Sequence, residues 1–307
     1  MSRALWAPVP DLAKLAQDLP QTQQFCSPSR YEAEVWARLQ DPGRADAGAA
    51  RLPFRRNLIA FRSGETTLWA GANSSGKSTM VSLCEVSWAM AGFDVVSLSL
   101  EEDPIAKVER YVRQVLGAKS ERLTHRQYLG ALEAIEPHLT LLDITGRMEP
   151  LHALALMQYA WREHGAQHFV LDNLTMCVPL GQEADSVLQQ FVGNVHALAR
   201  ASKMHIHCIA HIRKPLDNKP PGRYDIRGTG SASDQVDNVL MFWRDEAGED
   251  KGARTGAPEN MLRIDKQRRN GERHAIPLWH HQASKQFLVG PSDDPIAFFV
   301  PDQFLER

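Results

Sequence analysis

One stretch, residues 71–79, constrains this chain more than any other feature of its sequence. It matches the pattern G-x-x-x-x-G-K-[ST] in full: Gly71, Ala72, Asn73, Ser74, Ser75, Gly76, Lys77, Ser78 and Thr79. The glycines let the backbone curl so that its N–H groups point at phosphate oxygens, and the helix that follows adds the positive end of its dipole. Lys77 would reach the β- and γ-phosphates, and Ser78 would complete the shell of a Mg²⁺ ion. The stretch therefore predicts a site for ATP, or another NTP, with Mg²⁺.

The sequence on either side of this loop supports the interpretation. Residues 66–70 read as a buried strand, and residues 79–90 carry apolar side chains at helical spacing. A phosphate-binding loop has to follow a strand and open a helix, so both requirements are met. A Gly/Ser-rich turn without a ligand is the weaker alternative.

The bulk properties are those of a soluble globular chain. Its 307 residues and 43% hydrophobic content allow one large domain or two, with a sizeable core. No apolar run reaches the roughly 18 residues of a membrane span, and the first residues lack a signal-peptide core, so the cytoplasm or a similar reducing compartment is expected. The cysteines are scattered, which favours buried free thiols over disulfides or a zinc site: Cys26, Cys84, Cys177 and Cys208.

Strands and helices alternate along the middle of the chain, which predicts a parallel α/β sheet flanked by helices. Strands are expected at residues 94–100, 139–144, 168–173 and 205–211. Helices are expected at residues 105–116, 126–135, 151–161 and 187–201. Shorter strands then suggest an antiparallel C-terminal extension of the sheet: residues 238–243, 261–266, 275–279 and 286–289. The predicted fold class is α/β, with a mostly parallel sheet.

The two ends of the chain differ in composition from the middle. Residues 1–50 contain several prolines and end in an Ala/Gly run, which indicates an extension with one or two short helices. The best of these, residues 31–39, has one apolar face: Tyr31, Val35, Trp36 and Leu39. This face is expected to dock onto a neighbouring subunit or, equally, onto its own domain. Residues 291–307 look like a tail.

Polar residues at the ends of strands extend the predicted site. Asp172 ends an apolar strand, and ligands of open α/β sheets gather at the carboxyl ends of strands, so Asp172 is the expected Mg²⁺ partner beside Ser78. A helix cap is the alternative. No cysteine or carboxylate cluster completes a zinc site around His205 and His207. His211, at the end of its strand, is expected level with the loop, where it could sense the γ-phosphate.

A basic, polar segment with several prolines and glycines follows at residues 213–230. The whole chain is nearly neutral, with 35 basic and 37 acidic residues, yet residues 200–227 hold seven Lys/Arg and two acids. Connections of this length in compact domains usually carry function. A solvated surface loop is the alternative.

In this order, the motifs resemble the ring-shaped replicative DNA helicases of the DnaB-like superfamily, which have a RecA-like core. The likeness is closest to the mitochondrial helicase Twinkle and to the helicase half of bacteriophage primase-helicases. It rests on matching segments between about residues 55 and 290: residues 71–79, 99–102, 170–174, 211–215, 227–240 and 266–271. The resemblance implies a RecA-like P-loop NTPase domain at residues 51–290, between the extension at residues 1–50 and the tail at residues 291–307.

The resemblance also implies catalytic roles. Glu101 would be the general base that polarises the attacking water. Glu102 is the competing candidate for this role. Alternatively, both carboxylates serve only to cap the start of the next helix. His211 would couple hydrolysis to the adjoining basic loop. Arg268 would be an arginine finger acting on a neighbouring subunit, with Lys266 beside it, because alternate positions of one strand share a face. A surface basic strand is the alternative.

DNA contacts are implied for the basic segment. The residues are Arg213, Lys214, Lys219 and Arg223 in a first loop, and Arg227 and Gly228 in a second. Aromatic residues do not alternate with these, so we expect contacts to the nucleic-acid backbone, strong salt dependence and little sequence preference.

The implied function is that of an ATP-dependent DNA helicase that forms a homo-oligomeric, hexameric ring and translocates on single-stranded DNA in replication, with no membrane contact. A bacterial, phage or plasmid origin is favoured, with an organelle matrix as the alternative. No primase or zinc-binding region precedes the core in this sequence, so priming is expected to come from another protein, a lost domain or a longer parent chain, and a separate primase or polymerase is an expected partner. Asp234-Gln235 departs from the family pattern. A filament-forming RecA-type repair ATPase and a non-translocating helicase loader are the alternative functions.

Overall fold

The structure is a computed structural model of the chain. It describes residues 27–41, 43–179, 181, 183–212, 221–226, 232–244 and 258–300. The chain divides into two compact units, residues 1–47 and 48–307. No helix among the described residues is long and apolar enough to cross a membrane.

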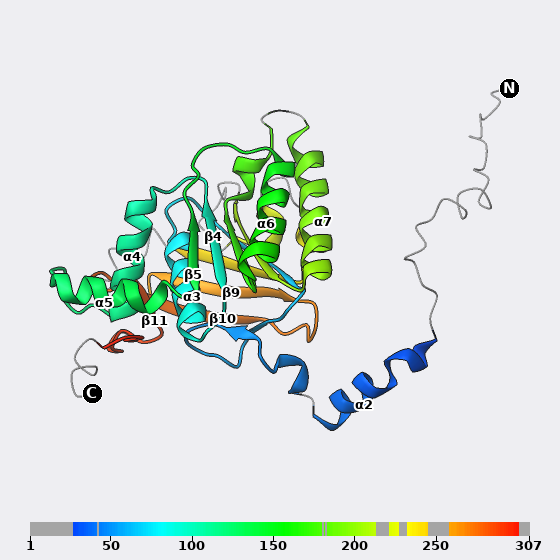
Figure 1. The fold of residues 1–307 in the computed structure, drawn as a ribbon, viewed down its shortest axis with the longest axis horizontal. Helices are drawn as coiled ribbons and strands as arrows, with labels where there is room; N and C mark the ends of the chain where they lie inside the picture. The colour runs from blue at the N-terminus through cyan, green and yellow to red at the C-terminus, as the bar shows by residue number, and fades with distance from the viewer. Residues whose placement is uncertain are drawn as a thin grey trace. The chain divides into compact units, whose positions relative to one another are not determined.

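The first unit contains the predicted N-terminal helix. Its elements are the 3₁₀ helix η1 (Pro28–Tyr31), α2 (Glu32–Gln40, Figure 1) and the 3₁₀ helix η2 (Arg44–Asp46). Arg38 and Glu34, one turn apart, pair at 2.7 Å on α2. The apolar face is 50–68% exposed: Tyr31, Val35, Trp36 and Leu39. The helix is confirmed, and its docking stays a prediction.

The second unit is built on a nine-stranded sheet, in the order β11-β10-β9-β8-β3-β7-β6-β4-β5. The parallel strands are β3 (Thr66–Gly71), β4 (Val95–Ser99), β5 (Leu139–Leu142), β6 (His168–Asp172), β7 (His205–His211) and β8 (Asn238–Arg244). The antiparallel strands are β9 (Asn260–Gln267), β10 (His274–His281) and β11 (Gln286–Leu288). A short antiparallel pair, β1 (Ala50–Arg51) and β2 (Ala60–Phe61), stands apart from this sheet. The predicted mostly parallel sheet with an antiparallel C-terminal extension is confirmed.

One strand was assigned to the wrong part of the sheet. Residues 238–243 were expected in the antiparallel extension, but β8 runs parallel to β3, with Gly71 opposite Phe242. The connection from β7 to β8 crosses over β3, because β7 and β8 lie on its two sides. Such a crossover makes neighbouring strands parallel. The antiparallel extension therefore begins at β9.

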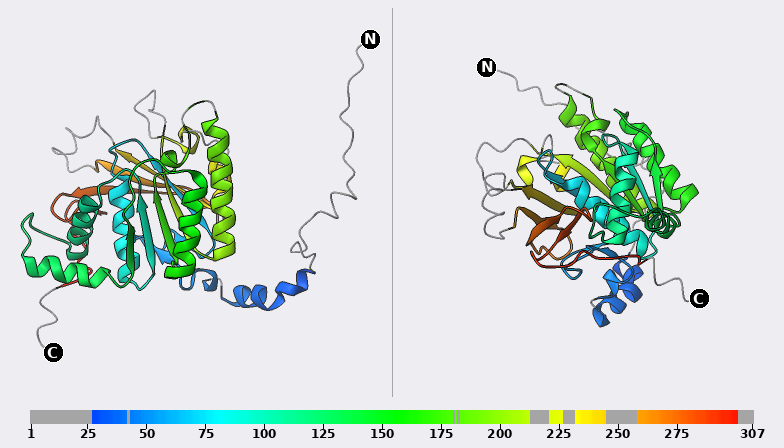
Figure 2. Two further views of the ribbon diagram at one scale, coloured as in Figure 1. Left: turned by 45° about the horizontal axis from the view of Figure 1, so that its top comes forward. Right: turned by 90° about the vertical axis from the view of Figure 1, so that its left-hand side faces the viewer.

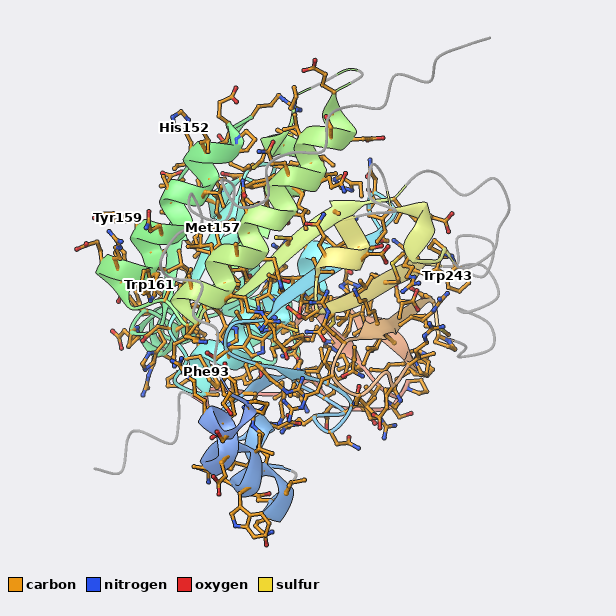
Figure 3. All side chains as sticks on the ribbon, turned by 90° about the vertical axis from the view of Figure 1, so that its right-hand side faces the viewer. Phe93, His152, Met157, Tyr159, Trp161 and Trp243 are labelled. Carbon is orange, nitrogen blue, oxygen red and sulfur yellow. The ribbon has the colours of Figure 1, made fainter. Side chains whose placement is uncertain are left out.

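Helices cover both faces of the sheet (Figures 1 and 2). They are α3 (Lys77–Met90), α4 (Pro104–Leu116), α5 (His125–Ile135), α6 (Pro150–His164), α7 (Ala184–Ser202) and the short α8 (Ala232–Gln235). Leu68 and Ala70 of β3 belong to the core beneath α6 and α7, whereas Trp69 between them packs with α3. On α6, Met157 is buried and Tyr159 is 56% exposed, so the helix has one core-facing side (Figure 3).

Local signals in the sequence set the ends of these helices. Pro104 opens α4 after Asp103, whose side chain accepts a hydrogen bond from the Ile105 N–H. Gly117 ends α4 in the left-handed conformation, at φ +55°. Thr124 and Gln127 form a reciprocal capping box at the start of α5.

The chain after β11, expected to be a tail from residue 291, packs on the domain as far as residue 299. The backbone N–H groups of Phe298 and Phe299 donate to the Val115 carbonyl at the end of α4, at 2.9 and 3.2 Å. The Phe299 ring lies where a Cβ on Gly130 of α5 would be. These contacts extend the domain beyond residue 290. Residues 301–307 lie outside the described residues.

The buried thiols and histidines have structural surroundings. Cys84, Cys177 and Cys208 are buried and free, as predicted, and Cys26 lies outside the described residues. His168 of β6 and His205 and His207 of β7 stack together with Trp88 beneath α3. No group of three or more His, Cys, Asp or Glu side chains that could hold a metal ion occurs in the described part of the chain.

The hydrogen bonds of these histidines fit neutral rings. Trp69 Nε1 donates to His207 Nδ1 at 3.3 Å, so the His207 Nε2–H can donate to His168 Nδ1 at 3.1 Å. His205 lies between the Arg62 carbonyl (2.7 Å) and the Thr67 hydroxyl (2.8 Å). Burial lowers the pKa of His205 to about 4 and lowers the pKa values of His168 and His207 well below their usual range.

These buried histidines predict loss of stability in mild acid. In the unfolded chain a histidine binds its proton near pH 6.5, whereas in the folded chain the three rings stay neutral to a lower pH. The contribution of these neutral rings to the free energy of unfolding is therefore complete above pH 6.5. It falls between pH 6.5 and 5, by about 1.4 kcal/mol per pH unit for each histidine. Urea unfolding at pH 7.5, 6 and 5 measures this slope. His164→Gln, a change at an exposed histidine, should leave the slope unchanged. A free energy of unfolding that does not change with pH would contradict the neutral state of the three buried histidines.

Candidate nucleotide-binding site

The candidate site lies at the edge where the parallel strands end. In the register of the sheet, Gly71 of β3 is opposite His211 of β7, and Ser99 of β4 is opposite Asp172 of β6. The loop of residues 71–79 leaves β3 at this edge and opens α3 at Lys77. The predicted sequence of strand, loop and helix is thus present, and several polar side chains chosen from the sequence meet there.

Both glycines of the loop pattern are required by close neighbours. A Cβ on Gly71 would collide with the Phe242 carbonyl oxygen. Gly76 has φ +99°, and a Cβ there would come within 2.8 Å of the Phe287 ring. The backbone can therefore curl over the end of the sheet only with glycine at these two positions.

The interior of the loop suits an anionic group. Lys77 is only 5% exposed, and its Nζ donates to the Ala72 carbonyl at 2.6 Å. Burial lowers the pKa of Lys77, and the nearby carboxylates of Asp172 and Glu101 oppose that shift. The Ser75 hydroxyl is buried with no hydrogen-bond partner among the described residues. Phosphate oxygens would satisfy both the ammonium and this hydroxyl.

Ser78 and Asp172 form the predicted metal pair. The Ser78 hydroxyl donates to Asp172 Oδ2 at 2.7 Å, which joins the start of α3 to the end of β6. Burial raises the pKa of Asp172, and the Lys107 ammonium partly opposes this. A hard cation such as Mg²⁺ takes a few protein oxygens and completes its shell with water and phosphate oxygens. The two side chains fit that ion, which would supply charge stabilisation at the phosphates.

Two adjacent carboxylates, the competing candidates for the general base, lie in different surroundings. Both oxygens of Glu102 accept from the Arg110 guanidinium at 2.5 Å, and Arg110 Nε also donates to the Ser82 hydroxyl of α3. Glu102 is therefore fully paired. The Glu101 side chain is 42% exposed, and its Oε2 lies 3.3 Å from His211 Nε2. Of the two, Glu101 is the carboxylate left open at the loop.

His211 links this carboxylate to the neighbouring strand. Asn173 Nδ2 donates to His211 Nε2 at 2.8 Å, while the Asn173 Oδ1 accepts from the loop after β6. The same Nε2 lies 3.3 Å from Glu101 Oε2, whereas His211 Nδ1 is buried and has no partner among the described residues. The His211 ring thus stands at the same edge as Glu101 and the loop.

Comparison with known proteins agrees with this geometry. Residues 37–217, more than half of the chain, match the profile of the AAA domain family. The chain belongs to the AAA domain family. The loop of residues 71–79 lies within the matched range.

Two solved structures share the fold. A DnaB-like replicative helicase, described with its interactions with primase, superposes with a TM-score of 0.71 at 14% identity, over 90% of this chain and 70% of that one. A second structure, that of an isolated ATPase domain, superposes with a TM-score of 0.69 at 15% identity, over 84% of this chain and 98% of that one. The predicted RecA-like fold of the DnaB-like helicases is confirmed.

Two of the predicted catalytic residues, Lys266 and Arg268, lie away from the loop. Lys266 Nζ donates to the carbonyls of Ser233, Asp234 and Val236, and Arg268 Nη2 donates to those of Asp234 and Gln235. Both cations thus contact the backbone of residues 233–236, although Arg268 lies one residue past the end of β9. However, Lys266 is opposite Val239 near the start of β8, whereas Gly71 is opposite Phe242 farther along the same strand. The structure does not bring these cations to the loop of their own chain.

Most of the predicted DNA-binding residues lie outside the described residues: Arg213, Lys214, Lys219, Arg227 and Gly228. Arg223 is described, on the 3₁₀ helix η4 (Arg223–Asp225). Ile212 and Ile226 form an isolated bridge beside it.

A pocket beside the phosphate-binding loop was not predicted. It has a volume of about 190 Å³ and is lined by loop residues and by residues in or next to β8, β9, β10 and β11: Ser74, Ser75, Gly76, Thr79, Arg244, Glu259, Asn260, His280 and Phe287. Burial lowers the pKa of His280 to about 4. No local sequence signal marks these strand residues, because pairing of the hairpins carries them to the loop.

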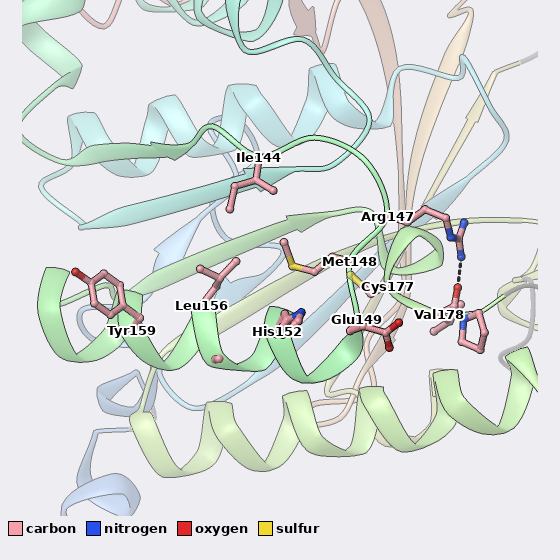
Figure 4. Close-up of a pocket in the computed structure, with 11 residues that line it drawn as sticks. Ile144, Arg147, Met148, Glu149, His152, Leu156, Tyr159, Cys177 and Val178 are labelled. Atoms are coloured by element: carbon pink, nitrogen blue, oxygen red, sulfur yellow. Dashed lines mark hydrogen bonds between the residues drawn. The ribbon is translucent and has the colours of Figure 1, made fainter.

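A second pocket lies away from the site. It measures about 720 Å³ and runs along α6, with Ile144, Leu156, Tyr159 and Val178 on its walls (Figure 4). Arg147 donates to the Val178 carbonyl at one end. Burial raises the pKa of Cys177 in its wall to about 12, so this thiol stays protonated. None of the predicted site residues lines this pocket.

Proposed function

We propose that this protein is an ATP-dependent DNA helicase that forms a ring and translocates on single-stranded DNA in replication. The observation that carries the proposal is the position of His211. Its ring contacts Glu101 at the nucleotide edge, and the basic segment begins two residues later. A change at the phosphates can therefore reach the basic segment through the end of a single strand. The shared fold with a DnaB-like replicative helicase supports the same function.

The chemistry assigned to the site follows from the contacts of its side chains. Lys77 and the loop N–H groups bind the β- and γ-phosphates of ATP, and Ser78 and Asp172 hold Mg²⁺. Glu101 orients and deprotonates the attacking water, and His211 senses the γ-phosphate. Arg244, His280 and Phe287 line the space beside the loop and hold the base or ribose of the nucleotide.

The cations expected to assist hydrolysis would act between subunits. Because Lys266 and Arg268 lie toward the other end of the sheet, we assign them to the nucleotide of a neighbouring subunit, in a hexameric ring. The exposed apolar face of α2 would dock on a neighbouring subunit of the same ring. Primase is the partner named for the DnaB-like helicase of similar fold, and a separate primase is the partner we expect for this chain, in the cytoplasm.

Strand separation tests the proposed function directly. With ATP and Mg²⁺, the full chain should unwind a forked DNA duplex, and Lys77→Ala should abolish unwinding because the phosphates lose their cation. Lys119→Ala, which removes an exposed lysine just past the end of α4, is the matched control and should unwind normally. DNA-stimulated hydrolysis with no unwinding, together with open filaments on DNA, would contradict the proposal and favour a repair ATPase. Hydrolysis unaffected by DNA would favour a helicase loader.

The role of Arg268 predicts complementation between subunits. Arg268→Ala should retain nucleotide binding, but its rate of hydrolysis should fall by a factor of roughly 10³ to 10⁵, as for other arginine fingers. A mixture of Arg268→Ala and Lys77→Ala subunits should recover part of the hydrolysis, because one subunit offers an intact loop and its neighbour an intact finger. A structural role alone cannot produce this recovery. A mixture as inactive as its two components would show that Arg268 does not act across an interface.

A further inference from the structure

The side chain of Asn173, directly after the end of β6, is wholly buried and held in one orientation. It caps the 3₁₀ helix η3 (Leu174–Cys177). Its Oδ1 accepts hydrogen bonds from the Thr175 N–H at 2.9 Å, from the Thr175 hydroxyl and from the Met176 N–H at 3.3 Å. All of these partners are donors, so the amide oxygen has to face η3. The NH₂ group of Asn173 therefore has to face the other way.

This NH₂ group meets an atom that a second residue also contacts. Asn173 Nδ2 lies 2.8 Å from His211 Nε2, and the same Nε2 lies 3.3 Å from Glu101 Oε2. An NH₂ group can only donate, so the contact with Asn173 requires a lone pair on Nε2. An ionised carboxylate can only accept, so a hydrogen bond with Glu101 requires a proton there. Asn173 and Glu101 therefore compete for one ring atom.

Burial decides this competition in favour of Asn173. The bond to His211 is the one hydrogen bond that Asn173 Nδ2 makes among the described residues, and water does not reach the amide, which is 0% exposed. Losing it would leave a buried donor unsatisfied. The Glu101 side chain is 42% exposed, so water can replace His211 as its donor. His211 Nδ1 has no partner among the described residues in either form and favours neither.

We propose that Asn173 is a positioning residue that occupies the lone pair of His211 Nε2 and so leaves the Glu101 carboxylate free to take a proton from the attacking water. A proton on Nε2 would instead be donated to Glu101, and a carboxylate that accepts such a bond is a weaker base. The same contact holds the His211 ring in place against η3. This inference rests on the proposed function, because it takes Glu101 as the general base.

The protonation of the ring tests the inference without any measurement of activity. The full chain is labelled with ¹⁵N-histidine, and ring-nitrogen NMR spectra are recorded at about pH 8, where a free imidazole is neutral. The His211 signals are identified by their loss in His211→Ala. The expected result is an unprotonated Nε2 and a protonated Nδ1. A protonated Nε2 would overturn the inference.

A matched pair of variants separates the contact with His211 from the cap of η3. Serine caps a helix about as well as asparagine but is too short to reach the ring, so Asn173→Ser removes only the donor. Its kcat for ATP hydrolysis should fall about tenfold, the size of one hydrogen bond, with KM unchanged because the phosphate-binding loop is untouched. Thr175→Val removes a donor to the same Oδ1 and leaves the His211 contact in place. It should keep the native kcat and KM.

A second comparison asks whether Asn173 acts through the ring. In a His211→Ala background, adding Asn173→Ser should not lower kcat further, because the ring that transmits its effect is gone. The same further loss in both backgrounds would overturn the inference, and so would an equal loss in Thr175→Val or a native kcat in Asn173→Ser. If Asn173→Ser does not fold, the NMR result on the native chain decides.

Failure of this inference can be told apart from failure of the proposed function. If the native chain hydrolyses ATP and unwinds DNA but carries its proton on His211 Nε2, only the role of Asn173 is overturned. If Glu101→Gln hydrolyses ATP at the native rate, the assigned base is wrong, and the role of Asn173 is overturned with it.

Discussion

The parallel hydrogen bonding of β3 between β7 and β8 is the constraint on which the rest of the structure depends. It sets Gly71 opposite both His211 and Phe242, so three strand ends reach one edge together. The loop of residues 71–79 can curl there only because Gly71 passes directly over the Phe242 carbonyl. The neighbouring strands continue the register, and Asp172 of β6 comes within 2.7 Å of Ser78 on α3. The geometry of the candidate nucleotide site is therefore a consequence of strand register.

The opposite end of β3 is held by a single buried carboxylate. Asp237, 3% exposed, accepts hydrogen bonds from the Thr66 N–H at 2.9 Å and from the Thr66 hydroxyl at 3.3 Å. Arg268 Nη1 lies 3.3 Å from the same carboxylate, and His196 of α7 lies 3.4 Å from it. A buried charge needs such partners to offset its lost hydration. Asp237 thus fixes Arg268 at the far end of the strand that carries the phosphate-binding loop, which agrees with a site completed between subunits.

The sequence predicted the parts of this site that are local and periodic. The loop pattern, the apolar strands and the polar residues at their ends were all readable, because each depends on neighbours in the chain. The direction of β8 could not be predicted, because a strand shows the same alternation of side chains whether its partner runs parallel or antiparallel to it. The resemblance favoured Glu101 over Glu102, but the contacts that distinguish them, Arg110 on Glu102 and His211 on Glu101, come from other elements and could not be predicted. Arg244, His280 and Phe287 could not be predicted as site residues, because only the pairing of their strands brings them to the loop.

The most direct test of this account is the rate of ATP hydrolysis by two matched variants, Glu101→Gln and Glu102→Gln, measured beside their affinity for a fluorescent ATP analogue. Each exchange removes one negative charge at adjacent positions with little change in shape. The account predicts that Glu101→Gln binds the nucleotide but hydrolyses it about 10² to 10⁴ times more slowly, the usual contribution of a general base. Glu102→Gln should keep most of its turnover, because its carboxylate pairs with Arg110 on the side of α4. Full turnover by Glu101→Gln, with the loss in Glu102→Gln instead, would contradict the account.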